Sequence, residues 1–240
     1  MKNRIVFSIV IMLLLVSCQD NSFRIINHKK PDLRVDFSLF QNAGCKSNGY
    51  DSYDCNEQSP LFKIGCNSIA KDDLLGGLTP NYPTVYCGHF VYQEFGIILP
   101  PTECLTSTVR QNGADCARLV IFKDNNYLLI KNIDELKKLF APVDSPEEAL
   151  SFALAGTKNY AEYGQTRKNN YVYEVQKLED TYVETIADGY IVHVFYTPGI
   201  GCGPFETEAV AVKVTHDGQI EEINRTPVYR DPANDTLCAD

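Results

Sequence analysis

Residues 145–156 read SPEEALSFALAG and carry the signature of a complete helix. Ser145 and Glu148 form a capping box, and Pro146 occupies the first helical position, where its missing N–H costs nothing. Gly156 stands where a glycine is expected just after a helix. The apolar stripe of the stretch consists of Leu150, Ala153 and Leu154. We therefore predict an amphipathic helix that packs against a sheet.

A shorter helix is expected just upstream, where Asn132 and Glu135 make an N-cap and N3 pair. Beyond Tyr171 the apolar period changes to two, which is typical of strands. The expected strands are Tyr171–Lys177, Tyr182–Ile186, Tyr190–Thr197, Thr207–Thr215 and Ile220–Asn224.

Asp188-Gly189 and Asp217-Gly218 lie at two junctions between these strands and predict hairpins with type I′ turns. A helix followed by an antiparallel β-meander predicts an α+β domain with the helix on one face of the sheet. The layout is similar to cystatin-like sheets that curl around a single helix. That likeness concerns the fold and implies no function.

Residues 31–130 show no sustained helical periodicity, and Gly, Pro and Asn turn signals interrupt their short apolar runs. We expect a loop-rich, mainly β part. Its expected strands are Val85–Val91, Ile97–Leu99 and a hairpin of Cys116–Lys123 with Tyr127–Ile130.

The N-terminus has the pattern of an export signal. Lys2 and Arg4 precede an apolar run of about a dozen residues, which is too short to span a bilayer. The run ends in Leu15-Val16-Ser17-Cys18, which resembles the lipobox of bacterial lipoproteins. The resemblance implies cleavage before Cys18 and acylation of that cysteine. The alternative is an ordinary secretory signal in which Cys18 is incidental.

The chain is thus expected to divide into four segments: a signal peptide (1–17), a tether (18–30), a disulfide-rich β domain (31–130) and an α+β domain (131–240). The expected location is the bacterial cell envelope, where lipid on Cys18 holds the protein to a membrane. Inner membrane, outer membrane and cell surface all stay open.

Cys18 accounts for one of nine cysteines and leaves an even set. An even set in an exported chain predicts disulfides. The candidates are Cys45, Cys55, Cys66, Cys87, Cys104, Cys116, Cys202 and Cys238. Six lie between residues 45 and 116, so we expect three bridges there and a fourth joining Cys202 to Cys238. Zinc is disfavoured because no two cysteines are closely spaced, and we predict no metal and no cofactor.

The formal net charge of −9 and the lack of a basic tract argue against nucleic acid as a partner. The sequence also lacks the motifs of serine hydrolases, zinc proteases, P-loops and calcium loops. The glycine-rich loop at residues 198–204 is expected to present Cys202 for bridging rather than to bind a ligand. The C-terminal acids Asp231, Asp235 and Asp240 are expected to be solvated.

His28 and His216 are expected to be solvated, whereas His89 and His193 lie in expected strands. The strand that carries His193 is apolar on both faces, so both faces should be covered. We expect the helix on one face and the cystine-rich half, or a partner, on the other.

Aromatic side chains give the most suggestive surface. Tyr171 and Tyr173 share one strand face, and Phe205 lies near the glycine-rich loop. Such residues make good contact surfaces because tyrosine combines rigid apolar area with a polar tip. We therefore expect a non-catalytic binding module for an envelope protein or a small ligand. The alternatives are a hydrolase built from scattered carboxylates with His89 or His193, and a protease inhibitor.

Overall fold

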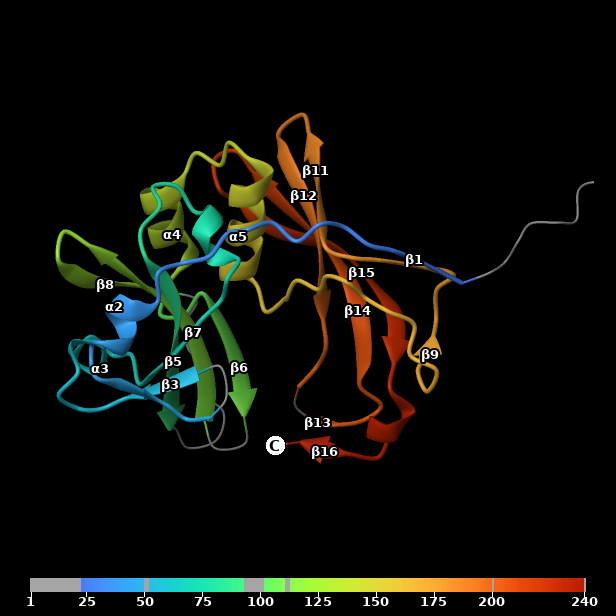
Figure 1. Ribbon diagram of the computed structural model, residues 1–240, viewed down its shortest axis with the longest axis horizontal. Helices are drawn as coiled ribbons and strands as arrows, with labels where there is room; N and C mark the ends of the chain where they lie inside the picture. Colours follow the sequence, from blue (N-terminus) through green and yellow to red (C-terminus); the bar gives the residue numbers. More distant parts are fainter. Residues whose placement is uncertain (1–22, 50–51, 93–101, 111–112, 200, 240) are drawn as a thin grey trace, which may run out of the picture.

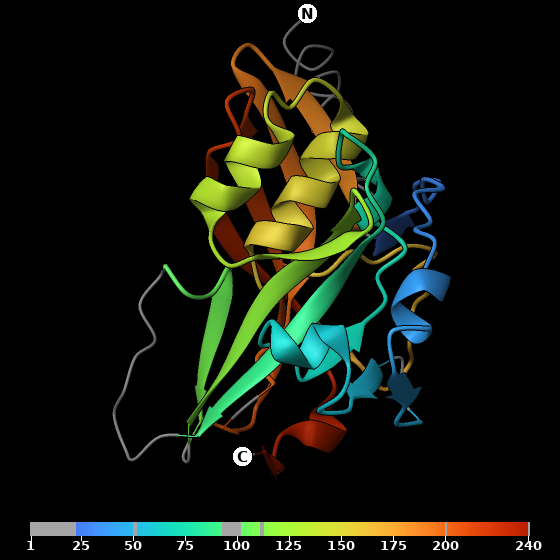
Figure 2. The ribbon, with the colours of Figure 1, turned by 90° about the vertical axis from the view of Figure 1, so that its left-hand side faces the viewer.

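The computed structural model describes residues 23–49, 52–92, 102–110, 113–199 and 201–239. Two antiparallel sheets diverge from each other, and two helices lie between them at one end (Figures 1 and 2). Strands predominate over helices, so the predicted α+β class is confirmed. Among the described residues, no helix has the length and apolar character needed to cross a bilayer.

A seven-stranded sheet forms from the N-terminal half of the chain. Its spatial order is β2 (Cys45–Ser47), β3 (Ser52–Cys55), β4 (Ser68–Ala70), β5 (Thr84–Tyr92), β7 (Gly113–Lys123) and β6 (Thr106–Arg110), with β8 (Asn126–Ile130) also paired to β7. The β7–β8 pair is the expected hairpin. Its loop residues Asp124 and Asn125 have φ of 51° and 61°, as a type I′ turn requires. The expected strand Ile97–Leu99 lies outside the described residues.

Both predicted helices are present, as α4 (Ile133–Phe140) and α5 (Pro146–Gly156). The Asn132 side chain accepts from the backbone N–H of Glu135 at 3.0 Å, and Ser145 Oγ accepts from that of Glu148 at 3.1 Å. Gly156 is the last helical residue, so its predicted place after the helix is wrong. A Cβ at this position would lie 2.3 Å from Ile220 Cδ1, and the glycine therefore permits close packing of the helix end.

The second sheet has the order β11 (Tyr182–Ile186), β12 (Gly189–Tyr196), β14 (Glu206–Thr215), β15 (Ile220–Arg230) and β9 (Val172–Tyr173). The predicted β-meander is confirmed. Its type I′ turns are not, because neither Asp188 nor Asp217 has a positive φ. Gly189 instead opens β12 with φ of 147°, and a Cβ there would lie 2.2 Å from the Val214 carbonyl oxygen.

One hydrophobic core joins the two halves. Helix α5 lies between both sheets and is buried over nearly its whole length, rather than along one stripe. The shared core includes Leu119 and Ile121 of β7, Leu136 and Phe140 of α4, Leu150 and Phe152 of α5, and Val192 and Val212 of the meander. The expected boundary near residue 130 therefore separates two sheets but does not separate two cores.

The face of the meander away from α5 is covered by the N-terminal segment. Strand β1 (Arg24–Ile26) pairs in parallel with β10 (Lys177–Glu179), and a small core of Leu178, Phe195 and Val228 lies beneath them. The N-terminal segment, and not the cystine-rich half, therefore lies on this face. The expected tether is also shorter than predicted, because backbone pairing fixes the chain from residue 24 onward.

Four disulfides connect Cys45–Cys55, Cys66–Cys87, Cys104–Cys116 and Cys202–Cys238. The predicted division into three N-terminal bridges and one C-terminal bridge is confirmed. Cys45 and Cys55 lie directly opposite each other in the β2–β3 ladder. Cys202 and Cys238 do the same between β13 (Gly201–Cys202) and β16 (Cys238–Ala239). These bonds indicate an oxidising, extracytoplasmic setting.

The remaining described elements are two short helices and two 3₁₀ turns: α2 (Ser38–Gln41), α3 (Pro60–Lys63), Leu75–Gly77 and Pro232–Asn234. Helices α2 and α3 pack beside the disulfide-bonded sheet, at the end of the molecule opposite to β1 and β9 (Figure 1). The molecule therefore has a disulfide-rich end with α2 and α3, an opposite end with β1 and β9, and a region between them where the two sheets meet.

Candidate functional site

A pocket of about 390 Å³ opens where the two sheets meet below the helices. Thr106 of β6 borders it on one side, and Tyr196, Ile220, Glu222 and Arg225 of the meander border it on the other. Ile133 of α4 and the residues that end and follow α5, Gly156, Thr157 and Lys158, complete its wall. We call this the inter-sheet pocket. It combines apolar walls with a few polar groups, as small-molecule sites commonly do.

The two cations of the inter-sheet pocket, Arg225 and Lys158, differ in their ion pairing. The guanidinium of Arg225 lies 4.3 Å from the centroid of the Tyr196 ring and forms ion pairs with Glu222 at 2.6 Å and Glu208 at 3.2 Å. Arg225 is therefore held by its own neighbours. Lys158 forms no ion pair with a described residue, and burial followed by repulsion from Arg225 lowers the pKa of its ammonium. Of these two cations, Lys158 is therefore the one available to bind an anionic group of a ligand.

An aromatic cluster forms at the β1–β9 end of the molecule. Phe23 and Tyr173 have ring centroids 4.3 Å apart, and Tyr229 lies 5.5 Å from Tyr171 and 6.0 Å from Tyr173. The backbone N–H of Lys168 donates to the hydroxyl of Tyr173 at 2.9 Å. A small pocket of about 130 Å³ lies among these tyrosines.

Two cations lie over this cluster. Arg167 stands 5.2 Å from the centroid of the Phe23 ring, and the Lys168 ammonium stands 4.5 Å from that of Tyr171. The Tyr229 hydroxyl donates to Glu162 at 2.8 Å, and burial, followed by the Glu162 charge, raises the pKa of Tyr229 well above its ordinary value. The outer side of the cluster thus carries the cations Arg167 and Lys168, and its carboxylate, Glu162, is hydrogen-bonded to the Tyr229 hydroxyl.

Tyr171 and Tyr173 both have ring contacts with Tyr229, but no ring contact joins Phe205 to either of them. Phe205 precedes β14 and is half-buried. Sequence reasoning missed Phe23, assigned to the tether, and Tyr229, which lies in an extension of β15 beyond its expected end at Asn224.

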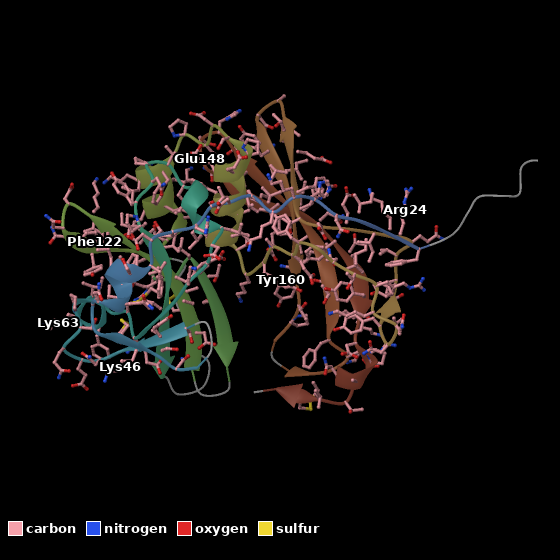
Figure 3. The ribbon with its side chains drawn as sticks, in the orientation of Figure 1. Arg24, Lys46, Lys63, Phe122, Glu148 and Tyr160 are labelled. Atoms are coloured by element: carbon pink, nitrogen blue, oxygen red, sulfur yellow. A yellow bond between two sulfur atoms is a disulfide. The ribbon has the colours of Figure 1, made fainter. Side chains whose placement is uncertain are left out.

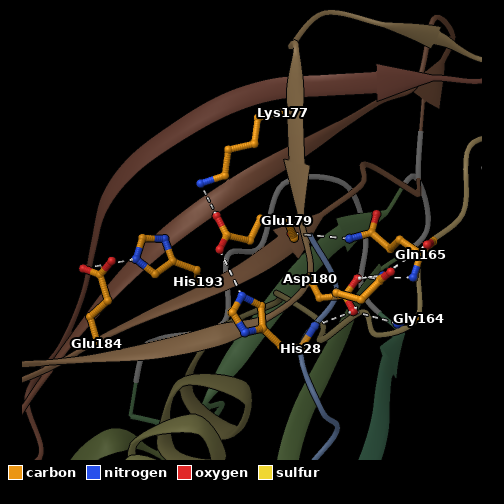
Figure 4. Close-up of polar contacts among 9 residues, drawn as sticks. His28, Gly164, Gln165, Lys177, Glu179, Asp180, Glu184 and His193 are labelled. Atoms are coloured by element: carbon orange, nitrogen blue, oxygen red, sulfur yellow. Dashed lines mark hydrogen bonds and ion pairs between the residues drawn. The ribbon is translucent and has the colours of Figure 1, made fainter. Parts of the chain in front are cut away.

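A histidine cluster lies beside the aromatic cluster, on the same face of the meander. The Tyr182 ring lies between two imidazoles, with centroids 5.1 Å from His28 and 4.1 Å from His193. His28 Nε2 contacts Glu179 at 3.0 Å, and His193 Nε2 lies 3.7 Å from Glu184 (Figure 4). His28 is therefore paired and stacked, contrary to its expected place in a solvated tether.

The carboxylate of Glu179 lies at the centre of the histidine cluster. It forms an ion pair with Lys177 at 2.5 Å as well as its contact with His28. Burial favours the neutral acid, but the hydrogen bonds from Lys177 and His28 outweigh it and lower the pKa of Glu179. His193 and Glu179 both line a pocket of about 250 Å³, and the buried Nε2 of His193 has no hydrogen bond with a described residue.

Comparisons with protein-family models, with curated proteins and with solved structures all find no match. Inference of function therefore rests on the residues of this chain.

The other predicted residues do not gather into a site. His89 lies in β5 opposite Cys116, and its side chain is outside the described part. His216 Nδ1 donates to the Val143 carbonyl oxygen at 2.7 Å, so this half-exposed histidine is partly held by the fold. The glycine-rich loop leads into β13 and the Cys202–Cys238 bridge, as expected.

The C-terminal acids serve local structure. Asp231 caps the Pro232–Asn234 turn by accepting from Ala233 N at 3.0 Å, and Asp235 pairs with Arg230. Asp240 lies outside the described residues. No group of three or more His, Cys, Asp or Glu in the described part of the chain is arranged to hold a metal ion.

Proposed function

We propose that this protein is an envelope lipoprotein, acylated on Cys18, whose folded part is a non-catalytic binding module for a small ligand. The lipobox-like Leu15-Val16-Ser17-Cys18 supports the anchor. The four disulfides support export, since such bonds persist in oxidising compartments.

The inter-sheet pocket is the observation that carries the binding function. Its volume of about 390 Å³ suits a small organic molecule. Ile133, Ile220 and the Tyr196 ring offer apolar contact, while Lys158 offers an unpaired positive charge. We therefore propose a ligand with an apolar body and one anionic group, such as a carboxylate or sulfonate.

A fluorescence titration tests this proposal. The probe is 8-anilinonaphthalene-1-sulfonate, a compact aromatic anion whose emission rises in an apolar site. We expect saturable binding that becomes about tenfold weaker in Lys158→Ala, because a charge-assisted contact is lost. Lys63→Ala, at the distant end of the molecule (Figure 3), is the matched control and should bind as the unsubstituted protein does. Equal binding by the two variants would refute the ligand site.

A second candidate function is hydrolysis at His193. The buried Nε2 without a hydrogen bond, the Glu184 carboxylate 3.7 Å away and the adjoining pocket of about 250 Å³ favour general acid–base chemistry there. A panel of ester, phosphoester and glycoside substrates provides the test. Turnover that disappears in His193→Ala and falls in Glu184→Gln would support hydrolysis. Turnover unaffected by His193→Ala would exclude this residue.

A further inference from the structure

Three exposed cations gather at the β1–β9 end of this acidic protein: Arg24, Arg167 and Lys168. None of them forms an ion pair with a described residue, although Lys168 donates to the Tyr171 hydroxyl at 3.3 Å. Four carboxylates lie on the same or adjoining segments. Glu162 is occupied by the Tyr229 hydroxyl, Glu179 by Lys177 and His28, and Asp180 by Asn27 and the backbone N–H groups of Gly164 and Gln165, whereas Glu174 is exposed. The net local charge carried by the unpaired groups is therefore positive, on a chain whose formal charge is −9.

Aromatic rings lie beneath two of these cations. Arg167 covers Phe23 and Lys168 covers Tyr171. Arginine and lysine on the outer side suit contact with lipid phosphates, and the tyrosine and phenylalanine rings beneath them are residue types that favour the membrane interface. We define the headgroup patch as Phe23, Arg24, Arg167, Lys168 and Tyr171.

The sequence places the headgroup patch close to the anchor. Only five peptide units separate Cys18 from Phe23, which limits their distance to about 18 Å. Phe23 is itself packed on Tyr173. A lipid on Cys18 would therefore hold this end of the molecule, and no other, at the bilayer surface. Arg24 lies at that end, whereas Lys63 and Phe122 lie at the opposite end (Figure 3).

We propose that the headgroup patch docks on the anionic lipid headgroups of the membrane that holds Cys18. This inference rests on the proposed anchoring and adds an orientation to it. The patch lies against the bilayer, and the disulfide-bonded sheet with α3 and β8 points away from it. Each cation strengthens the contact about fivefold, so loss of all three weakens it by about a hundredfold.

The experiment couples the unacylated chain, starting at Cys18, through its thiol to maleimide-bearing vesicles of phosphatidylethanolamine and phosphatidylglycerol. The other eight cysteines are in disulfides, so Cys18 is the reactive thiol. The protein has no tryptophan, and Tyr171→Trp therefore supplies a single reporter. Brominated lipid should quench this tryptophan strongly. It should quench Leu128→Trp, on exposed β8 at the far end, only weakly.

A variant without the three cations tests their part in the contact. Adding Arg24→Gln, Arg167→Gln and Lys168→Gln to the Tyr171→Trp chain should clearly lower its quenching, as should high salt, although coupling through Cys18 keeps it above that of Leu128→Trp. Equal quenching of the two reporters, or quenching unchanged by the three substitutions, would overturn the proposal. Because chemical coupling replaces acylation, this outcome is independent of whether Cys18 is acylated in cells, which fractionation of Cys18→Ala tests separately.

Discussion

The carboxylate of Asp180 accepts a hydrogen bond from the backbone N–H of His28 at 3.1 Å, across 152 positions of sequence. The same buried carboxylate accepts from the Asn27 amide at 3.2 Å and from the backbone N–H groups of Gly164 and Gln165 at 2.8 and 3.2 Å. One side chain thereby fixes both the N-terminal segment and the loop that carries Arg167 and Lys168.

Replacing this carboxylate should destabilise the fold. Asp180→Ala leaves several buried donors without an acceptor, and we expect a loss of about 3 kcal/mol in the free energy of unfolding. Asp36→Ala is the control because that exposed carboxylate bonds only to nearby Ser38, and its effect should stay within about 0.5 kcal/mol. Urea denaturation measures both. Similar values for the two variants would contradict the role of Asp180.

Acid should weaken the protein through the same region. Burial opposes ionisation of Asp180, but the N–H groups of Gly164 and Gln165 and the Asn27 amide outweigh it and lower the Asp180 pKa. The pKa of Glu179 is also lowered. A lowered pKa in the folded state means that the stabilisation is complete above the ordinary values of 3.8 and 4.5 and is lost as pH falls through the lower, folded values.

The urea midpoint should therefore fall with decreasing pH below about 4.5 and fall less steeply in Asp180→Ala. Parallel pH profiles for the unsubstituted protein and Asp180→Ala would show that this carboxylate does not drive the acid response.

Gly77 should tolerate no side chain. Its Cβ would lie 2.3 Å from the Glu147 carbonyl oxygen and 2.5 Å from Ser151 Oγ, at the contact between the 3₁₀ turn and α5. We expect Gly77→Ala to cost about 1–3 kcal/mol, because the backbone of α5 has to move. Gly199→Ala meets nothing within 4 Å and should leave the thermal midpoint nearly unchanged. An unchanged thermal midpoint in Gly77→Ala would show that the 3₁₀ turn and α5 can move apart at little cost in stability.

Two disulfides with matched geometry should differ in their contribution. Cys45–Cys55 and Cys202–Cys238 both span Cα–Cα distances of 4.0 Å, but their sequence separations are 10 and 36. In the chain-entropy view, the longer loop is worth about 4 kcal/mol and the shorter about 3 kcal/mol. Paired Cys→Ala variants, compared by chemical denaturation, check the order. A larger loss for the Cys45–Cys55 pair would point to native contacts instead of loop entropy.

Cys18→Ala should move the protein from the membrane fraction to the soluble fraction of cells, since acyl chains supply the stable attachment. Extraction into a detergent phase provides a second readout. Retention of Cys18→Ala in the membrane fraction would exclude the lipid anchor while leaving the fold and its pockets untouched.

Local signals in the sequence predicted local structure well. The Asn132 and Ser145 caps and the Cys202–Cys238 pairing are confirmed, since each depends on residue type and on counting within a short stretch or a small set. Pairing among the six N-terminal cysteines cannot be derived from the sequence, because spacing alone allows many connectivities.

Contacts between segments that are far apart in the chain could not be predicted from the sequence. Three residues, Arg24–Ile26, are too few to show strand periodicity, and their partners Lys177–Glu179 lie far away in the chain. The inter-sheet pocket was missed for a similar reason: Thr106, Lys158 and Arg225 meet only because a common core brings two sheets together. The glycines that open β12 and end α5 are visible in the sequence, but their close neighbours Val214 and Ile220 cannot be inferred from it.

Parallel pairing of β1 with β10 also has a mechanical consequence. If the chain is anchored at Cys18, any pull between membrane and protein enters through Arg24–Ile26 along the strand axis. Because ladder hydrogen bonds run between neighbouring strands, such a pull loads them together, in shear, rather than opening them one at a time. Asp180 follows the last residue of this ladder and accepts hydrogen bonds from the Asn27 side chain and the backbone N–H of His28. A force applied at Cys18 is therefore resisted first by the β1–β10 hydrogen bonds and by the bonds of Asp180 to Asn27 and His28, before it acts on the hydrophobic core.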